Sequence, residues 1–224
     1  MSKLYIIPTP IGNLEDISLR AIRLLKEVDL ALCEDTRVTG KLLKHYDIKV
    51  KMLSFHLHNE HRTLSSIMSR LEEGQQLALL SDAGMPGISD PGFLLVRECA
   101  RQGIAIESLP GPTAFVPALV ASGIPCDRFC FEGFLPVKKG RQTRLTALAS
   151  ETRTMVFYES PHRLLKTLRE FSEVFGNHRA ACVSREISKI HETHHRGSLE
   201  ELLNEFSDRT IKGEITIIVG GHSD

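Results

Sequence analysis

The segment from Ser81 to Gly92 combines residue types that suit a small, charged ligand. It reads Ser-Asp-Ala-Gly-Met-Pro-Gly-Ile-Ser-Asp-Pro-Gly and lies between an apolar run at residues 77–80 and a helical pattern near Phe93. Its glycines permit positive φ angles and let a ligand approach the main chain. Its carboxylates, Asp82 and Asp90, would repel a phosphate but accept hydrogen bonds from cationic groups and hydroxyls. The segment therefore predicts a binding loop for a ligand with positive charge.

The composition of this loop narrows the choice of ligand. It lacks the Lys-Ser/Thr pair of a phosphate-binding P-loop, and no Gly-x-Gly-x-x-Gly follows an expected strand. S-adenosylmethionine, by contrast, carries an ammonium group, a sulfonium and ribose hydroxyls, which suit an acidic loop. Taken alone, the loop is interpreted more simply as a rigid surface turn, because Gly and Pro are common in such turns.

Two further turns rich in Gly and Pro also follow apolar runs. Residues 8–14 read Pro-Thr-Pro-Ile-Gly-Asn-Leu and leave the first apolar run, and residues 111–114 read Gly-Pro-Thr-Ala after a run that ends at Leu109. Parallel strands bring the loops at their carboxyl ends to one edge of the sheet, where open α/β sheets bind ligands. Three such loops together favour a small-molecule site over three unrelated turns.

The elements that must position these loops alternate along the chain. Helical patterns, such as the apolar face at Leu64, Ile67, Met68 and Leu71, separate the apolar runs. This alternation predicts an α/β fold with a largely parallel sheet covered on both faces. The expected strands lie at residues 4–7, 30–33, 77–80, 104–109, 129–134, 155–158, 180–183 and 215–219, with a short one around Met52.

A boundary is expected about halfway along the chain, near Pro110-Gly111-Pro112-Thr113. It divides the chain into two α/β domains, 1–112 and 113–224. A cleft between two such halves is a natural site for a small molecule.

Composition excludes several other classes of protein. The chain has 224 residues, of which 42% are apolar and 25% are charged, and no apolar run approaches the roughly 18–20 residues of a membrane span. The N-terminus does not resemble a signal peptide, and five scattered cysteines suit a reducing compartment, so we expect a cytoplasmic protein. Because 28 basic residues balance 28 acidic ones, any contact with nucleic acid must come from local patches.

Five motifs occur in an order that resembles a known family. They are Pro8–Asp16, Cys33-Glu34-Asp35-Thr36-Arg37, Ser81–Gly92, Gly111–Ala114 and Glu159-Ser160-Pro161-His162-Arg163. Together they resemble the tetrapyrrole-methylase superfamily and, within it, the family that methylates the 2′-oxygen of a cytidine in small-subunit (16S) ribosomal RNA. The resemblance covers nearly the whole chain, and the motifs at 82–92 and 159–163 are specific to that family.

This resemblance implies a fold, a cofactor and partners. It implies two α/β domains with S-adenosylmethionine held in the cleft between them, a homodimer, and small-subunit ribosomal RNA as the acceptor within an assembled 30S particle. The implied cofactor residues are Pro10, Asp82, Ala83, Gly84, Pro86, Ile88, Thr113 and Ala114, with looser matches at Tyr158, Ile187 and Thr216. Many members continue beyond the strand near Ile215 into a small C-terminal domain, whereas this sequence ends at Asp224, so its contacts with RNA need not be the same as theirs.

Acidic and basic residues at the ends of two expected strands suit the acceptor. Glu34 and Arg37 follow the run at 30–33, and Glu159, His162 and Arg163 follow the run at 155–158. A carboxylate or histidine there would accept the proton of a 2′-hydroxyl, so Glu159, His162 and Glu34 are equal candidates for the catalytic base. The alternative is that these charges form ion pairs that serve the structure.

A basic stretch is the expected contact with RNA phosphates. Residues 133–150 contain no acidic residue but hold Lys138, Lys139, Arg141 and Arg144. Lys138, Lys139 and Arg141, with Arg37 and Arg163, are therefore predicted to bind RNA. A solvated basic loop explains the same composition.

Two histidine clusters do not predict a metal site. Neither the cluster at His56, His58 and His61 nor the one at His191, His194 and His195 has a recognised ligand spacing, and Cys126 and Cys130 are not paired with a second motif. We therefore expect no bound metal.

Two other functions fit parts of the pattern. A tetrapyrrole C-methyltransferase on the same fold would need an apolar trough for a macrocycle, whereas the acceptor-side motifs here are rich in charged residues and histidine. A non-catalytic RNA-binding or assembly module would not need the three clustered loops.

Overall fold

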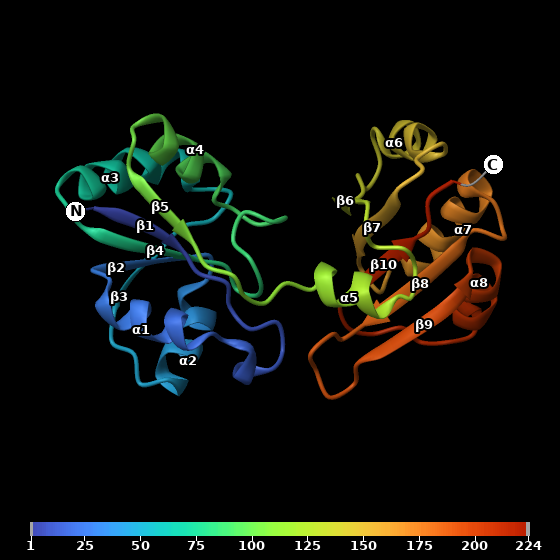
Figure 1. Cartoon of the computed structure of the whole chain (residues 1–224), viewed down its shortest axis with the longest axis horizontal. Helices are drawn as coiled ribbons and strands as arrows, with labels where there is room; N and C mark the ends of the chain where they lie inside the picture. Colours follow the sequence, from blue (N-terminus) through green and yellow to red (C-terminus); the bar gives the residue numbers. More distant parts are fainter. Residues whose placement is uncertain (1, 223–224) are drawn as a thin grey trace. The chain divides into compact units, whose positions relative to one another are not determined.

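The computed structural model describes residues 2–222, and the chain divides into two compact units, Met1–Thr113 and Ala114–Asp224. Each unit contains one five-stranded sheet with its own helices (Figure 1). No helix in this described range is long and apolar enough to cross a membrane.

The first unit is built on a parallel sheet. Its strand order is β3-β2-β4-β1-β5, and each pair of neighbours runs in the same direction. The strands are β1 (Lys3–Ile6), β2 (Leu30–Cys33), β3 (Lys51–Ser54), β4 (Gln76–Leu80) and β5 (Ala105–Ser108). The α-helices are α1 (Leu19–Glu27), α2 (Thr36–His45), α3 (Glu60–Glu72) and α4 (Phe93–Arg101), and a 3-10 turn spans Leu14–Asp16.

Alternate strand residues of this sheet enter two separate cores. On one face Tyr5 and Ala78 pack with α1 and α2, and on the other Leu4 and Leu77 pack with α3 and α4. Figure 1 shows α1 and α2 below this sheet and α3 and α4 above it. Strands buried on both faces are continuous apolar runs, so the sequence predicted this parallel, covered sheet correctly.

The second unit has a mixed sheet. Its order is β6-β7-β10-β8-β9, and only β6 and β7 pair in parallel, while the other pairs are antiparallel. The strands are β6 (Phe129–Phe134), β7 (Thr154–Glu159), β8 (Ala180–Arg185), β9 (Thr193–Ser198) and β10 (Ile215–Val219). The helices are α5 (Phe115–Ala121), α6 (Arg141–Leu148), α7 (Leu164–Phe175) and α8 (Leu199–Ser207).

The prediction of a largely parallel sheet is wrong for this unit. The segment 186–192 that joins β8 to β9 contains no helix and is too short for a crossover, so the two strands pair antiparallel. The strand β9 itself was not predicted, because it is a polar edge strand without an apolar run.

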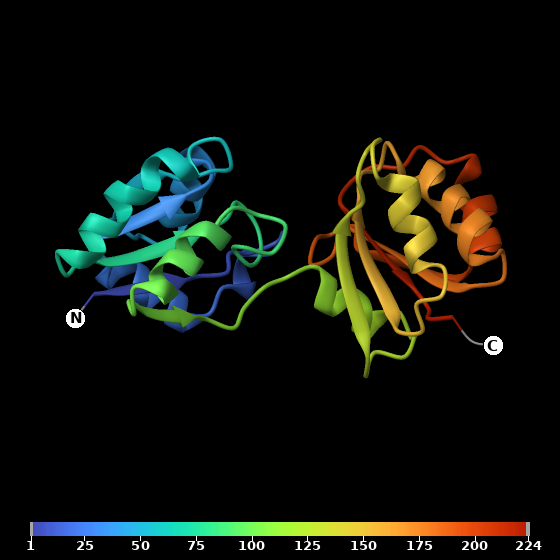
Figure 2. The same cartoon turned by 90° about the horizontal axis from the view of Figure 1, so that it is seen from above.

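Helices lie on both faces of the second sheet. Apolar residues of α6, α7 and α8 form one core with Phe157, Val183 and Ile217. The helix α5 lies on the other face, where the ring centroids of Phe115 and Phe131 are 4.9 Å apart (Figure 2). Ser198 is the last residue of β9 and the N-cap of α8. It forms a capping box with Glu201, so the strand passes directly into the helix.

Candidate functional site

The loops after β1 and β4 are joined by backbone hydrogen bonds. The Thr9 amide donates to the Gly84 carbonyl oxygen at 3.0 Å, and the Gly84 amide donates to the Thr9 carbonyl oxygen at 2.9 Å. The Thr9 hydroxyl also donates to the Ser81 carbonyl oxygen at 3.0 Å. Because β1 lies between β4 and β5 in the sheet, the three turns rich in Gly and Pro gather at one edge, as predicted.

Two glycines at this edge are constrained for different reasons. Gly84 has φ +83°, and a Cβ there would make only an ordinary contact, 3.5 Å from Ile11 Cγ2, so its constraint is the backbone conformation. A Cβ on Gly111 would lie 2.9 Å from Pro8 Cβ and Cγ. The loops after β1 and β5 therefore approach each other as closely as a glycine allows.

Three carboxylates at the same edge lie in surroundings that raise their pKa. Burial, together with the charge of Glu34, raises the pKa of Asp90 to about 7. Burial and the charge of Asp82 raise the pKa of Glu34, and burial raises the pKa of Asp82 as well. Groups that raise one another's pKa favour a ligand that brings positive charge. We call Glu34, Asp82 and Asp90 the acidic cluster.

The neighbouring Asp35 differs from this cluster because it has a cationic partner. Arg37 Nη2 lies 2.6 Å from Asp35 Oδ2, and hydrogen bonds from Arg37 lower the pKa of Asp35 to about 2. The Arg37 side chain is 86% exposed. Of the predicted acceptor residues after β2, Arg37 thus belongs to a surface ion pair, and Glu34 belongs to the acidic cluster.

The predicted cofactor residues of the first unit lie on these gathered loops. Pro10 follows the Thr9–Gly84 bridge, and Asp82 accepts a hydrogen bond from the Asp35 amide at 3.0 Å. Gly84 and Pro86 are buried, whereas Ala83 and Ile88 are exposed. The remaining one, Thr113, ends the segment that follows β5.

In the second unit, two of the other predicted cofactor residues lie near the end of β7. Tyr158 is in register with Thr216 on β10, which in turn is in register with Ser184 on β8. Ile187 is buried just beyond β8, and Ala114 precedes α5 as its N-cap residue. Tyr158 and Thr216 therefore lie side by side in the sheet.

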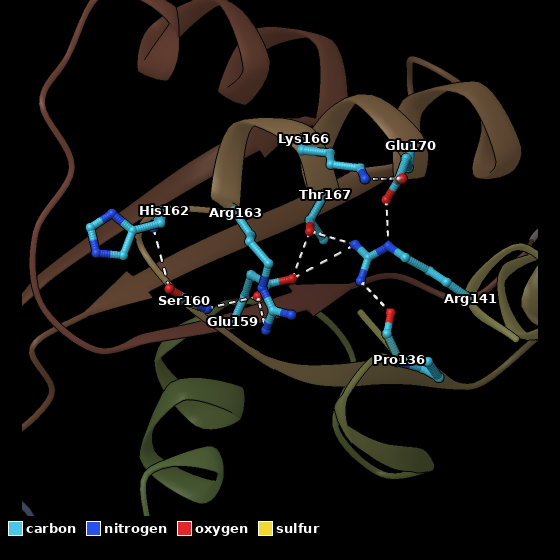
Figure 3. Close-up of polar contacts among 9 residues, drawn as sticks. All are labelled: Pro136, Arg141, Glu159, Ser160, His162, Arg163, Lys166, Thr167 and Glu170. Atoms are coloured by element: carbon cyan, nitrogen blue, oxygen red, sulfur yellow. Dashed lines mark hydrogen bonds and ion pairs between the residues drawn. The ribbon is translucent and has the colours of Figure 1, made fainter. Parts of the chain in front are cut away.

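The end of β7 holds a buried ionic network around Glu159 (Figure 3). Glu159 is 3% exposed, and its Oε1 lies 2.8 Å from Arg163 Nη2 and accepts a hydrogen bond from the Ser160 amide at 2.7 Å. Its Oε2 accepts a hydrogen bond from the Thr167 hydroxyl at 2.6 Å and lies 3.7 Å from Arg141 Nη2. Both carboxylate oxygens are thus occupied by groups of the protein.

Arg141 closes this network from the side of α6. It is 5% exposed, and its guanidinium donates to Glu170 Oε2 at 2.7 Å, to the Thr167 hydroxyl at 2.6 Å and to the Pro136 carbonyl oxygen at 3.2 Å. A buried charge requires such partners because desolvation is costly. This corrects the expectation that Arg141 is a surface contact for phosphate and that Glu159 has a free oxygen for a proton.

Comparison with known proteins decides the family. Residues 3–203 match the model of the tetrapyrrole (corrin/porphyrin) methylases. The chain belongs to the tetrapyrrole methylase family.

Its relatives within this family include proteins named ribosomal RNA small subunit methyltransferase I. The chain is 50% identical to that of Escherichia coli, over 98% of this chain and 78% of the relative. It is 48% identical to that of Thermotoga maritima over 99% of both chains, and 46% identical to that of Synechocystis over 99% of this chain and 80% of the relative.

Solved structures of tetrapyrrole methylases share the fold. A cobalt precorrin-4 methyltransferase superposes with a TM-score of 0.70 at 21% identity, over 97% of this chain and 94% of that chain. A uroporphyrin-III-C-methyltransferase from Thermus thermophilus superposes with a TM-score of 0.68 at 22% identity and the same coverage. The α/β fold that the resemblance to tetrapyrrole methylases implied, the class III methyltransferase fold, is thereby confirmed.

The remaining predicted acceptor residues of this tetrapyrrole methylase lie on the surface of the second unit. His162 is exposed, and in Figure 3 its ring points away from Glu159, while its amide donates to the Ser160 hydroxyl at 3.3 Å. Lys138 and Lys139 are exposed and enter no ion pair among residues 2–222. Arg163 forms an ion pair with Glu159, and its side chain is partly exposed to solvent.

Sequence reasoning missed a hydrogen-bonded chain on β9. The Ser184 hydroxyl lies 2.9 Å from His194 Nδ1, and His194 Nε2 lies 2.8 Å from Glu192 Oε1. Within the part of the chain that is described, no group of three or more metal-ligating side chains occurs. A sequence signal for the end of β9 was present. Ser198 and Glu201 form a capping box, which marks the start of α8 and therefore the point where the preceding strand must end.

Proposed function

We propose that this tetrapyrrole methylase transfers a methyl group from S-adenosylmethionine to small-subunit ribosomal RNA. The observation that carries the proposal is identity of 46–50% over nearly the whole chain to proteins named ribosomal RNA small subunit methyltransferase I. The family uses S-adenosylmethionine as its methyl donor. When bound, this cofactor supplies an electrophilic methyl group.

The residues of the first unit fit such a cofactor. The acidic cluster offers acceptors to cationic groups, and the bridge between Thr9 and Gly84 fixes the loops that carry Pro10, Asp82, Ala83, Pro86 and Ile88. Gly84 keeps the main chain free of a side chain where φ is positive. We propose these residues and Thr113, together with Ala114, Tyr158, Ile187 and Thr216 of the second unit, as the cofactor contacts.

The acceptor is proposed to be the 2′-hydroxyl of a cytidine. Such a hydroxyl must be placed in line with the methyl group and must lose its proton. Glu34 is the best-supported base, since its raised pKa increases its affinity for a proton. His162 is exposed and remains a second candidate, whereas Glu159 positions the end of β7 because both its oxygens are occupied.

RNA phosphates are proposed to contact basic residues that are accessible. Lys138 and Lys139 meet this condition fully, and Arg37 and Arg163 meet it in part. We further propose an assembled 30S particle as the substrate, a homodimer as the active form, a cytoplasmic location, and separate domains at 1–112 and 113–224.

A tetrapyrrole acceptor is less well supported. The tetrapyrrole methyltransferases of known structure are 21% and 22% identical to this chain, which supports the common fold but not a common acceptor. A non-catalytic RNA-binding module would leave the acidic cluster without a role.

The test is methyl transfer from labelled S-adenosylmethionine to 30S subunits that lack their own modification. We expect label in the RNA, with a 2′-O-methylcytidine identified by mass after digestion. Parallel reactions contain naked small-subunit RNA and uroporphyrinogen III. Label in uroporphyrinogen alone would support the tetrapyrrole alternative, and cofactor binding without transfer to any acceptor would contradict the proposal.

A variant refines the acceptor chemistry. Glu34→Gln is expected to slow methylation of 30S subunits by about 100-fold at saturating substrate, because general-base catalysis contributes on this order. The matched control is Glu15→Gln, an exposed glutamate of the same unit. A normal rate in Glu34→Gln would move the role of base to His162.

A further inference from the structure

A groove on the second unit lies between the edge strand β6 and the helix α6. Its volume is about 490 Å³, and its lining includes Phe134 and Pro136 from the β6 side and Thr143 and Arg144 from α6. Volumes of about 300–1,000 Å³ are typical of sites for small organic groups. The catalytic and cofactor residues proposed above do not line it, so its features need their own explanation.

An aromatic ring forms one wall of the groove. Phe134 is 55% exposed although it is a large apolar residue at the end of a strand. Its ring contacts Tyr158, with ring centroids 5.5 Å apart. The Pro136 carbonyl oxygen accepts a hydrogen bond from the buried Arg141, so the wall that follows Phe134 is tied to the Glu159 network. The ring therefore packs against Tyr158 while more than half of the side chain stays open to a ligand.

Arg144 of α6 also lines the groove and brings hydrogen-bond donors to it. Arg144 Nε and Nη2 donate to the two carboxylate oxygens of Glu132, each at 2.8 Å. The Glu132 side chain is nearly buried, whereas half of the Arg144 side chain is exposed. Because both Glu132 oxygens are occupied, the pair offers a ligand the remaining N–H donors of the half-exposed Arg144 guanidinium, which suit an acceptor on the edge of a nucleobase.

The charge near the groove is positive. Lys138 and Lys139 belong to the loop that joins Pro136 to α6, and both are exposed without an ion pair among the described residues. Arg144 is neutralised by Glu132, so these lysines supply the net charge. A strand of another protein is a poor fit, because the pairing of β6 shifts register between Phe131 and Gly133, and such a bulge disfavours pairing at a sheet edge.

We infer that this groove binds one unpaired nucleobase of the RNA, stacked on Phe134, with a flanking phosphate on Lys138 or Lys139. The inference rests on the proposed function, which makes RNA the substrate. Phe134 is in register with Tyr158, one of the proposed cofactor contacts. The groove therefore holds a base close to the modified nucleotide and contributes to the choice of site.

The test uses a short single-stranded RNA that carries one 2-aminopurine, whose fluorescence falls when it stacks. Binding to the wild-type protein is expected to quench the probe. Phe134→Ala and Phe134→Leu are expected to abolish the quenching and weaken affinity about tenfold, because stacking on an aromatic ring contributes that much. Phe134→Tyr should retain both signals. The matched control is Val137→Ala, an apolar residue of the same segment with 60% exposure that does not line the groove.

Three outcomes separate the possibilities. If Phe134→Ala and Phe134→Leu bind and quench the probe as the wild-type protein does, the groove is not a base site. If they bind the probe normally but lose affinity for 30S particles, the groove holds a protein segment, which also overturns the inference. If the wild-type protein binds and quenches the probe through Phe134 yet methylates no RNA, the proposed function fails while the base site stands.

Discussion

Carboxylates lie at the carboxyl ends of strands in both units, but their surroundings differ. In the first unit, burial raises the pKa of each member of the acidic cluster. The charges of neighbouring carboxylates raise the pKa of Glu34 and Asp90 further. In the second unit, Glu159 is enclosed by Arg141, Arg163 and the Thr167 hydroxyl. The same residue type therefore has two kinds of surroundings: burial disfavours the charged forms of the acidic cluster, whereas Glu159 contacts cations and a hydroxyl donor of the protein itself.

This comparison has a physical basis in the cost of burying charge. A carboxylate that has its own cations is stable without a ligand, so it suits a structural role. A carboxylate whose pKa is raised is destabilised in its charged form until a positive group arrives. Motifs alone do not distinguish the two cases, because Cys33–Arg37 and Glu159–Arg163 both place acids beside an arginine.

The largest expected effect is on stability and concerns Arg141. Arg141→Ala should lower the free energy of unfolding by about 3–5 kcal/mol, because it removes a buried cation that contacts Glu159, Glu170 and the Thr167 hydroxyl. Urea denaturation followed by circular dichroism measures the change. The control is Arg153→Ala, which removes an exposed pair with Glu151 and should leave stability nearly unchanged. Equal stability of wild type and Arg141→Ala would show that the network is not structural.

A smaller effect on stability is expected from Asp90, with the opposite sign. The pKa of Asp90 rises from an ordinary 3.8 to about 7 in the folded protein. The protonated Asp90 side chain therefore contributes fully to stability below about pH 4, and this contribution is lost as the pH rises through 7. Asp90→Asn should therefore gain about 2 kcal/mol of stability relative to wild type between pH 5 and pH 8. Thermal denaturation of both proteins across this range measures it.

The control for this measurement is Asp47→Asn. Asp47 is exposed and has φ +50°, a conformation that asparagine also tolerates. A stability difference between Asp90→Asn and wild type that does not change with pH would contradict the uncompensated charge at Asp90.

The double variant Lys138→Ala/Lys139→Ala probes the surface beside the Glu159 network. It should weaken RNA binding about tenfold at moderate salt and reduce the slope of log K against log salt by about one to two. Fluorescence anisotropy with small-subunit RNA at several salt concentrations measures both. Lys49→Ala/Lys51→Ala, which removes two exposed lysines of the first unit, serves as the control. An unchanged slope would identify the 138–139 segment as a solvated loop.

The sequence was most informative where local patterns determine the structure. The strands β2, β6 and β10 were predicted with the bounds that they have, because apolar runs ended at clear turns. The gathering of the loops after β1, β4 and β5 followed from parallel strands. The insertion of β10 between β7 and β8 depends on long-range pairing that no local pattern encodes.

The roles of single charged residues were harder to predict. Arg141 and Lys139 are two positions apart, yet Arg141 is buried and Lys139 is exposed. The difference arises because Glu159 and Glu170, which surround Arg141, come from distant parts of the chain. At Asp90 the fold also decides, because burial and the charge of Glu34 raise its pKa, whereas the partner of Asp35 is Arg37, only two positions away.

Calorimetric titration of S-adenosylmethionine into Asp82→Asn and Glu159→Gln, with a chelator present, tests the central distinction most directly. We expect Asp82→Asn to remain as stable as wild type and to lose about tenfold in cofactor affinity, since removal of one charge from a charge-assisted contact costs about 1.4 kcal/mol or more. Glu159→Gln should bind the cofactor within about twofold of wild type at a temperature where it is folded, despite its lower stability. Normal binding by Asp82→Asn, or a large loss in Glu159→Gln, would contradict the assignment of the acidic cluster to the ligand and of Glu159 to the scaffold.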